Sequence, residues 1–256
     1  MKRLVISAIF TAFCGLALFA QTYKDGFYFA QDSDFTNNQK NQIVLEVKGG
    51  KIASANFNIE SLAAGAQDLK TIAGSSGAAN VKTWAAQAKA TEDFLVSSQN
   101  VNAASVPNGL PDVKPFFDLA KKALGSSPVA KGGYKDGWYY AIDSDADGYH
   151  TKNYTLITVV NGTIVDVLWN GVLEGMPPSI NPSKQITSRA NGYPMSNTKG
   201  PWHVQSAAVA AELLRVQNPD SIKLNADGKH PDAISGASIE INHFIAVAKQ
   251  ALQSAK

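Results

Sequence analysis

The chain reads YKDGFYFAQDSD at residues 23–34 and YKDGWYYAIDSD at residues 134–145. Near-identity of two stretches this far apart indicates an internal repeat, in which one structural unit occurs twice along the chain. The repeat decides the architecture, because whatever follows the first stretch is expected to return in similar form after the second.

A predicted β-hairpin follows each stretch. Apolar and polar residues alternate at 42–47 and again at 154–160, and a tight-turn dipeptide comes next in both copies. The dipeptides and the runs that follow them are Gly49-Gly50 with Lys51 onward, and Asn161-Gly162 with Thr163 onward. Alternation on both sides of such a dipeptide predicts a hairpin, because a type I′ turn needs positive φ at both central residues.

Each copy then ends in a predicted amphipathic helix. Apolar residues recur at steps of three and four, which places them on one helix face. They are Val113, Phe116, Phe117, Ala120 and Leu124 in the first copy, and Ile241, Phe244, Ile245, Ala248 and Leu252 in the second. A further helix precedes the last one, at Val81–Val96 and at His203–Val216. Strands and helices are segregated, so we predict an α+β fold made of two tandem antiparallel-sheet-plus-helices units.

The chain divides into a leader and two units. Lys2 and Arg3 precede an apolar run at 4–19, which is typical of a signal peptide at 1–20 with cleavage after Ala20. The first unit covers 21–125 and the second covers 134–256, with a Gly- and Ser-rich linker between them. The apolar run is short for a membrane span. We therefore expect an exported protein of the periplasm or cell envelope, with association at the membrane surface as an option.

Cys14 is the chain's one cysteine and lies inside the apolar run. It leaves open a lipoprotein anchor, although the residues before it fit poorly and cleavage after Ala20 is preferred. Lys plus Arg total 23 and Asp plus Glu total 21, for a net charge of +2. This balance argues against a nucleic-acid partner, which a concentrated basic surface would indicate.

The two copies differ just before the last helix. The second copy carries an additional segment at 225–238 that ends in Pro-Asp-Ala-Ile-Ser-Gly-Ala-Ser. When the last helices are aligned, Ser238 corresponds to Leu110, which has no hydroxyl. One copy therefore offers a hydroxyl as an attachment point and the other does not.

The segment Asp232-x-x-Ser235-Gly236-Ala237-Ser238 resembles the flavinylation motif of the FMN-binding domain family. That family includes the covalent-FMN subunits of the Rnf and sodium-pumping NADH:quinone complexes, and exported proteins of extracellular electron transfer. The resemblance takes in most of the second unit and, more weakly, the first. It implies FMN joined through its phosphate to Ser238, a flavin transferase as maturation partner, and recognition of that transferase or of its metal by Asp232.

The resemblance also implies redox partner proteins or a quinone-linked donor, and a flavin contact at Glu174, where relatives carry Glu-Thr-Pro-Gly. Physical arguments accompany it. Gly236 and Ala237 allow close approach to the backbone, and a phosphate on Ser238 would lie near a helix N-terminus, which favours anions. The alternative is that Ser238 is an ordinary helix N-cap, which leaves the rest of the motif unexplained.

Other residues suggest weaker sites. Six aromatic residues offer faces that could stack on an isoalloxazine ring, or else belong to the core: Trp138, Tyr139, Tyr140, Tyr149, Trp169 and Trp202. The run from Asp143 to Gly148 opens like an EF-hand loop but has Tyr154 where the bidentate Glu should be, which leaves at most a weak Ca²⁺ site. His150 and His243 lack a second ligand at metal spacing. No metal site is predicted.

Two functions from different classes follow. The first is an electron carrier with one covalent FMN, rather than a catalyst acting alone. The second is a non-redox exported module that binds a ligand or a weakly held metal and has an unmodified Ser238. The first unit is expected to be structural, with a non-covalently bound second flavin as the alternative.

Overall fold

The computed structural model describes residues 22–256, apart from 76, 194 and 196–198. In these residues the protein is mixed α/β, with two three-stranded antiparallel sheets and six α-helices. The predicted leader at 1–20 and Cys14 lie outside the described residues. No helix within the described part is long and apolar enough to span a membrane.

The two sheets have the same construction. Each is a meander in which the middle strand pairs with both neighbours. The first sheet consists of β1 (Gly26–Gln31), β2 (Gln39–Lys48) and β3 (Lys51–Ser61), and the second of β4 (Gly137–Ile142), β5 (Thr151–Val160) and β6 (Thr163–Leu173). Both middle strands carry a register shift near their ends, at Glu46/Val47 and at Thr158/Val159.

The expected hairpin turns are confirmed. Gly49 and Gly50 have φ of 59° and 73°, and Asn161 and Gly162 have φ of 51° and 76°. Positive φ at both central residues is the condition for a type I′ turn. An aspartate of the repeated stretch holds each turn, because Asp25 accepts the amides of Gly49 and Gly50, and Asp136 accepts that of Gly162.

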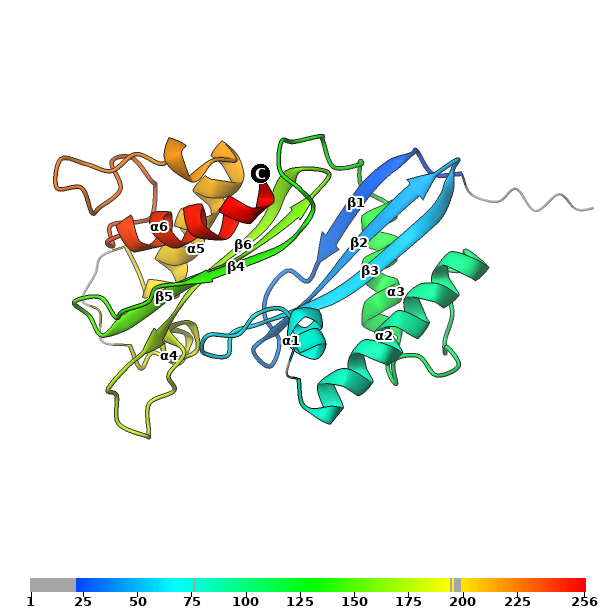
Figure 1. Ribbon diagram of the computed structural model, residues 1–256, viewed down its shortest axis with the longest axis horizontal. Helices are drawn as coiled ribbons and strands as arrows, with labels where there is room; N and C mark the ends of the chain where they lie inside the picture. Colours follow the sequence, from blue (N-terminus) through cyan, green and yellow to red (C-terminus); the bar gives the residue numbers. More distant parts are fainter. Residues whose placement is uncertain (1–21, 76, 194, 196–198) are drawn as a thin grey trace, which may run out of the picture.

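Helices cover one face of each sheet. They are α1 (Leu69–Ser75), α2 (Ala79–Ser98) and α3 (Lys114–Leu124) in the first half, and α4 (Lys184–Arg189), α5 (Trp202–Val216) and α6 (Asn242–Leu252) in the second. The predicted helical stripes pack against the sheets and are buried, except for Leu124, which is half-buried. Figure 1 shows the sheets in the middle of the molecule, with α5 and α6 outside one and α2 and α3 outside the other.

A glutamine fixes the end of the long helix in each half. Gln99 and Gln217 adopt left-handed φ of 56° and 58° just after α2 and α5. The side chain of Gln99 binds both the N–H and the C=O of Ile52, and the side chain of Gln217 does the same with Ile164. The match in atomic detail agrees with the internal repeat that the sequence indicates.

Polar side chains join the two sheets on their inner faces. Lys40 of β2 lies 2.9 Å from Asp166 of β6 and 2.8 Å from Glu60 of β3, and all three side chains are buried. The hydroxyl of Tyr154 donates to the carbonyl of Ala63. The Gly- and Ser-rich linker is also held by both halves, since its Val129 amide donates to Phe27 O and its Val129 carbonyl accepts from Asn161. The halves therefore pack as one body along this interface.

Candidate functional site

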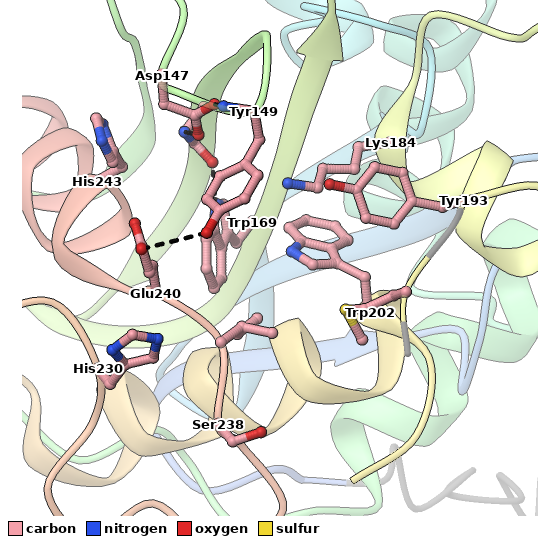
Figure 2. Close-up of a pocket in the computed structure, with 13 residues that line it drawn as sticks. Asp147, Tyr149, Trp169, Lys184, Tyr193, Trp202, His230, Ser238, Glu240 and His243 are labelled. Carbon is pink, nitrogen blue, oxygen red and sulfur yellow. Dashed lines mark hydrogen bonds between the residues drawn. The ribbon is translucent and has the colours of Figure 1, made fainter. Parts of the chain in front are cut away.

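A cavity of about 240 Å³ opens in the second half, at the end of its sheet. Several segments supply its walls: the loop before β5, strands β5 and β6, helices α4, α5 and α6, and the loop before α6. Figure 2 shows ten of its residues labelled around the hollow, namely Asp147, Tyr149, Trp169, Lys184, Tyr193, Trp202, His230, Ser238, Glu240 and His243. The cavity brings together residues that are far apart in the sequence.

Aromatic rings form its base and one side. Trp169 packs edge-on against Trp202 at 5.2 Å between ring centroids, and tilted against Phe244 at 5.1 Å. The indole N–H of Trp169 donates to Asn153 at 3.2 Å. These contacts hold the two buried indoles in fixed orientations, so the base of the cavity is rigid and apolar.

Tyr149 lies over the cavity and is mostly exposed. Its hydroxyl donates to Glu240 at 3.3 Å, which connects the loop before β5 with the loop before α6. Of the six aromatic residues suggested from the sequence, Tyr149, Trp169 and Trp202 line the cavity. The others lie elsewhere: Trp138 and Tyr140 pack between the two sheets, and Tyr139 packs against the core of the second half.

The motif loop borders the same cavity. Gly236 has φ of 81°, a left-handed conformation that glycine adopts without strain. Ala237 is buried in the core, whereas Ser238 is exposed and lines the cavity. The loop is pinned by Gln205 of α5, whose side-chain oxygen accepts the Ser238 amide at 2.9 Å and lies 3.4 Å from the Ser238 hydroxyl. Ser238 thus lies at the surface of a fixed loop, and its hydroxyl donates to the buried Gln205 side chain.

Ser238 lies before the last helix but does not cap it. Helix α6 begins at Asn242, its N-cap is Ile241, and no side chain caps it. The Ile241 amide instead donates to the carbonyl of Lys229 at 2.8 Å, which keeps the chain from entering the helix sooner. The N-cap alternative for Ser238 fails for the same reason, and neither the dipole of α6 nor its first free amides lie at this residue.

The first half lacks the acceptor in structure as well as in sequence. Helices α3 and α6 begin at equivalent residues, so Leu110 is the counterpart of Ser238. Its side chain is buried, and its amide donates to Thr91 of α2 much as the Ser238 amide donates to Gln205 of α5. The backbone arrangement is kept, and a buried apolar side chain in the first half replaces the hydroxyl of the second.

Two other residues of the motif lie on its loop, whereas Glu174 lies away from it. Asp232 and Ser235 are exposed on the loop that leads to Ser238, where another protein can reach them. Glu174 follows β6 and is paired with Lys152 at 3.0 Å. It is not among the residues that line the cavity, so the structure does not bring it together with Ser238.

Sequence reasoning missed Lys184 and Tyr193, both of which line the cavity. Lys184 is almost fully buried, and its ammonium lies 4.7 Å from the ring centroid of Trp202 and 4.9 Å from that of Tyr193. Desolvation by burial lowers its pKa to about 8. A lysine in a polar stretch of sequence gives no sign of burial, because the burial arises from contacts between segments that are distant in the chain.

The aspartate-rich loop before β5 binds its own backbone. Asp147 accepts the amides of Tyr149 and Thr151, and Asp143 lies 3.2 Å from His243. Within the described residues no group of three or more His, Cys, Asp or Glu side chains is placed to hold a metal ion. His150 lies in the same loop and has a left-handed φ of 56°.

The similarity of this chain to known proteins is limited, and one solved structure matches part of it. No protein-family model matches the chain, and no curated protein matches it. A solution NMR structure of a structural-genomics protein from Clostridium thermocellum is 38% identical over 46% of this chain and 90% of its own, with a TM-score of 0.36. Its description names no activity or ligand, and the structural likeness is too low to carry an argument.

Proposed function

We propose that the protein is an exported electron carrier that holds one FMN through a phosphoester on Ser238. The observation that carries this proposal is the position of Ser238: an exposed residue with a hydroxyl, on a motif loop pinned by Gln205, at the border of a cavity lined by aromatic residues. Its counterpart in the first half, Leu110, has no hydroxyl and is buried. One covalent flavin per chain follows.

The attachment chemistry needs an activated flavin phosphate. A phosphoanhydride donor, such as a flavin dinucleotide, would supply it: the Ser238 oxygen bonds to the flavin phosphorus, the anhydride bond breaks, and a nucleoside monophosphate leaves with the hydroxyl proton lost to water. Gly236 and the exposed Asp232 and Ser235 leave this side of the loop open to a transferase. The family resemblance of the motif supports the same assignment.

In this proposal, the ring end of such a group occupies the cavity. Tyr149, which is mostly exposed, and Tyr193, which is half-buried, line the cavity and supply aromatic rings near its opening. The cavity volume of about 240 Å³ lies somewhat below the roughly 300 Å³ at which small-molecule pockets usually begin. We therefore assign the ring to the cavity and the sugar-phosphate chain to its open border at Ser238. A ring held next to solvent is suited to electron exchange with partner proteins.

A covalent tether suits a protein of the periplasm or cell envelope, because it prevents loss of the cofactor where free FMN would diffuse away. The first half, with its own packed core, would act as structural support. Electron exchange with redox proteins or a quinone-linked donor completes the proposal, and catalysis by this chain alone is not part of it. The competing function is a module that binds an aromatic ligand without covalent attachment.

The test is denaturing gel electrophoresis of the protein produced together with a flavin transferase. Wild-type protein should give a fluorescent band, and Ser238→Ala should lose that fluorescence. Ser221→Ala, which removes an exposed hydroxyl elsewhere on the same half, should keep it. A fluorescent band of unchanged intensity in Ser238→Ala would contradict the assignment of the acceptor.

A further inference from the structure

The two halves differ at a second position on the same cavity. Asn58 and Asn170 are equivalent residues. The side-chain oxygen of each accepts two backbone N–H groups, one from the next residue and one from the first turn of a short helix. Those helices are α1 and α4. Leu69 is the first residue of α1 and Lys184 is the first residue of α4, so the two residues are counterparts. An apolar residue in one half is thus replaced by a buried ammonium in the other, beside the cavity that holds Ser238.

Lys184 reaches its position through close packing. A side chain at Gly171 would come within 2.3 Å of Thr151 and 3.4 Å of the Lys184 stem, so glycine leaves the room that the lysine occupies. Figure 2 shows the side chain extending from its helix toward the middle of the cavity, with its nitrogen near the Trp202 indole. The ammonium is therefore presented to whatever fills the cavity.

The ammonium has weak partners in the described residues. Its nearest polar contact is the Thr151 hydroxyl at 3.5 Å, and no carboxylate there forms an ion pair with it. Two ring faces offset part of the desolvation cost, but a buried charge normally needs a paired anion. The other titratable groups at the cavity are Asp147, Tyr149, Tyr193, His230, Glu240 and His243.

We propose that Lys184 binds the electron-rich edge of the flavin ring in this cavity and stabilises the negative charge that the ring gains on reduction. This inference rests on the proposed function. Uptake of two electrons and one proton from a donor protein leaves one negative charge on an isoalloxazine ring, and a positive group beside it favours the reduced form. Burial lowers the pKa of Lys184, and the Asp147 carboxylate acts in the opposite direction, so a further negative charge in the cavity would raise this pKa.

The test compares the midpoint potential of the attached flavin in wild type, Lys184→Met, Lys184→Arg and Lys249→Met. Lys249 lies on α6, pairs with Asp220 and does not line the cavity, so its variant removes the same charge elsewhere on the second half. Lys184→Met should shift the potential to a more negative value, Lys184→Arg should retain most of the wild-type value, and Lys249→Met should match wild type.

A second readout uses the lysine itself. With ¹⁵N-labelled lysine, the Lys184 ammonium signal, assigned by its loss in Lys184→Arg, should titrate at a higher pH when the flavin is reduced than when it is oxidised. Equal potentials in wild type and Lys184→Met, or equal Lys184 pKa in both redox states, would overturn the inference while leaving the tether intact. Wild-type protein without flavin would overturn the proposed function and this inference together.

Discussion

At the scale of single residues, the site depends on a few side chains that set the position of one hydroxyl. Gln205 is fully buried, and its oxygen accepts the Ser238 amide while its nitrogen donates to the Gly200 carbonyl. This glutamine fixes the loop, because both the amide and the hydroxyl of Ser238 donate to its side-chain oxygen. A transferase would meet an acceptor whose position is already determined.

Replacement of Gln205 should therefore impair flavin attachment. Gln205→Leu keeps the volume but removes the acceptor of the Ser238 amide, which frees the loop to adopt other conformations. We expect the loaded fraction to fall several-fold under limiting transferase, measured as fluorescence per protein in a denaturing gel. Gln217→Leu, which alters the glutamine that fixes the end of α5, serves as the matched control for general destabilisation. Equal loading in Gln205→Leu and wild type would show that the loop needs no such anchor.

At the scale of elements, each half has an aromatic cluster between its sheet and its helices. Phe57 contacts Trp84 and Phe116 in the first half, with ring centroids 6.3 and 5.3 Å apart. Trp169 contacts Trp202 and Phe244 in the second, at 5.2 and 5.1 Å. Both clusters belong to the core of their half, and in the second half Trp169 and Trp202 also border the cavity.

Truncation of the equivalent phenylalanines in the two halves should separate an effect on stability from an effect on the flavin environment. Phe116→Ala and Phe244→Ala each remove a fully buried ring and should lower the free energy of unfolding by about 3–5 kcal/mol. Urea unfolding followed by tryptophan fluorescence measures both losses. Only Phe244→Ala should also change the visible spectrum of the attached flavin, because Phe244 supports Trp169. Identical spectra in the two variants would argue against a ring in the cavity.

The elements show what a sequence can predict and what it cannot. Local sequence patterns were sufficient to predict the hairpins, because Gly49-Gly50 and Asn161-Gly162 favour a single type of turn. They were also sufficient to predict the apolar faces of α3 and α6. They failed at Ser238, where a tertiary bond from Ile241 to Lys229 delays the helix. Burial of Lys184 depends on contacts between distant segments, for which sequence spacing gives no signal.

At the scale of the whole molecule, the two halves are joined through a buried charged group. Lys40 lies between Glu60 and Asp166, so one cation faces two carboxyls. Burial, with the neighbouring Asp166, raises the pKa of Glu60 to about 8. A protonated Glu60 leaves one lysine and one aspartate as a balanced pair, which is the arrangement a buried interface tolerates.

Stability should therefore depend on pH through Glu60. Between its ordinary pKa of 4.5 and about 8, folded protein keeps a proton that the unfolded chain has lost, so stability falls as the pH rises through this window. Glu60→Gln is neutral at every pH and lacks this dependence. Urea unfolding from about pH 5 to about pH 8 should show the free energy of unfolding of the variant increasing relative to that of wild type as the pH rises. Parallel pH profiles would contradict a protonated Glu60.

The central claim is one covalent flavin on one hydroxyl, and intact mass spectrometry of protein isolated from cells with an active transferase tests it most directly. We expect a mature chain heavier by one FMN less one water, and an unmodified mass for Ser238→Ala. An unmodified wild-type mass, in cells that load another acceptor protein, would contradict it.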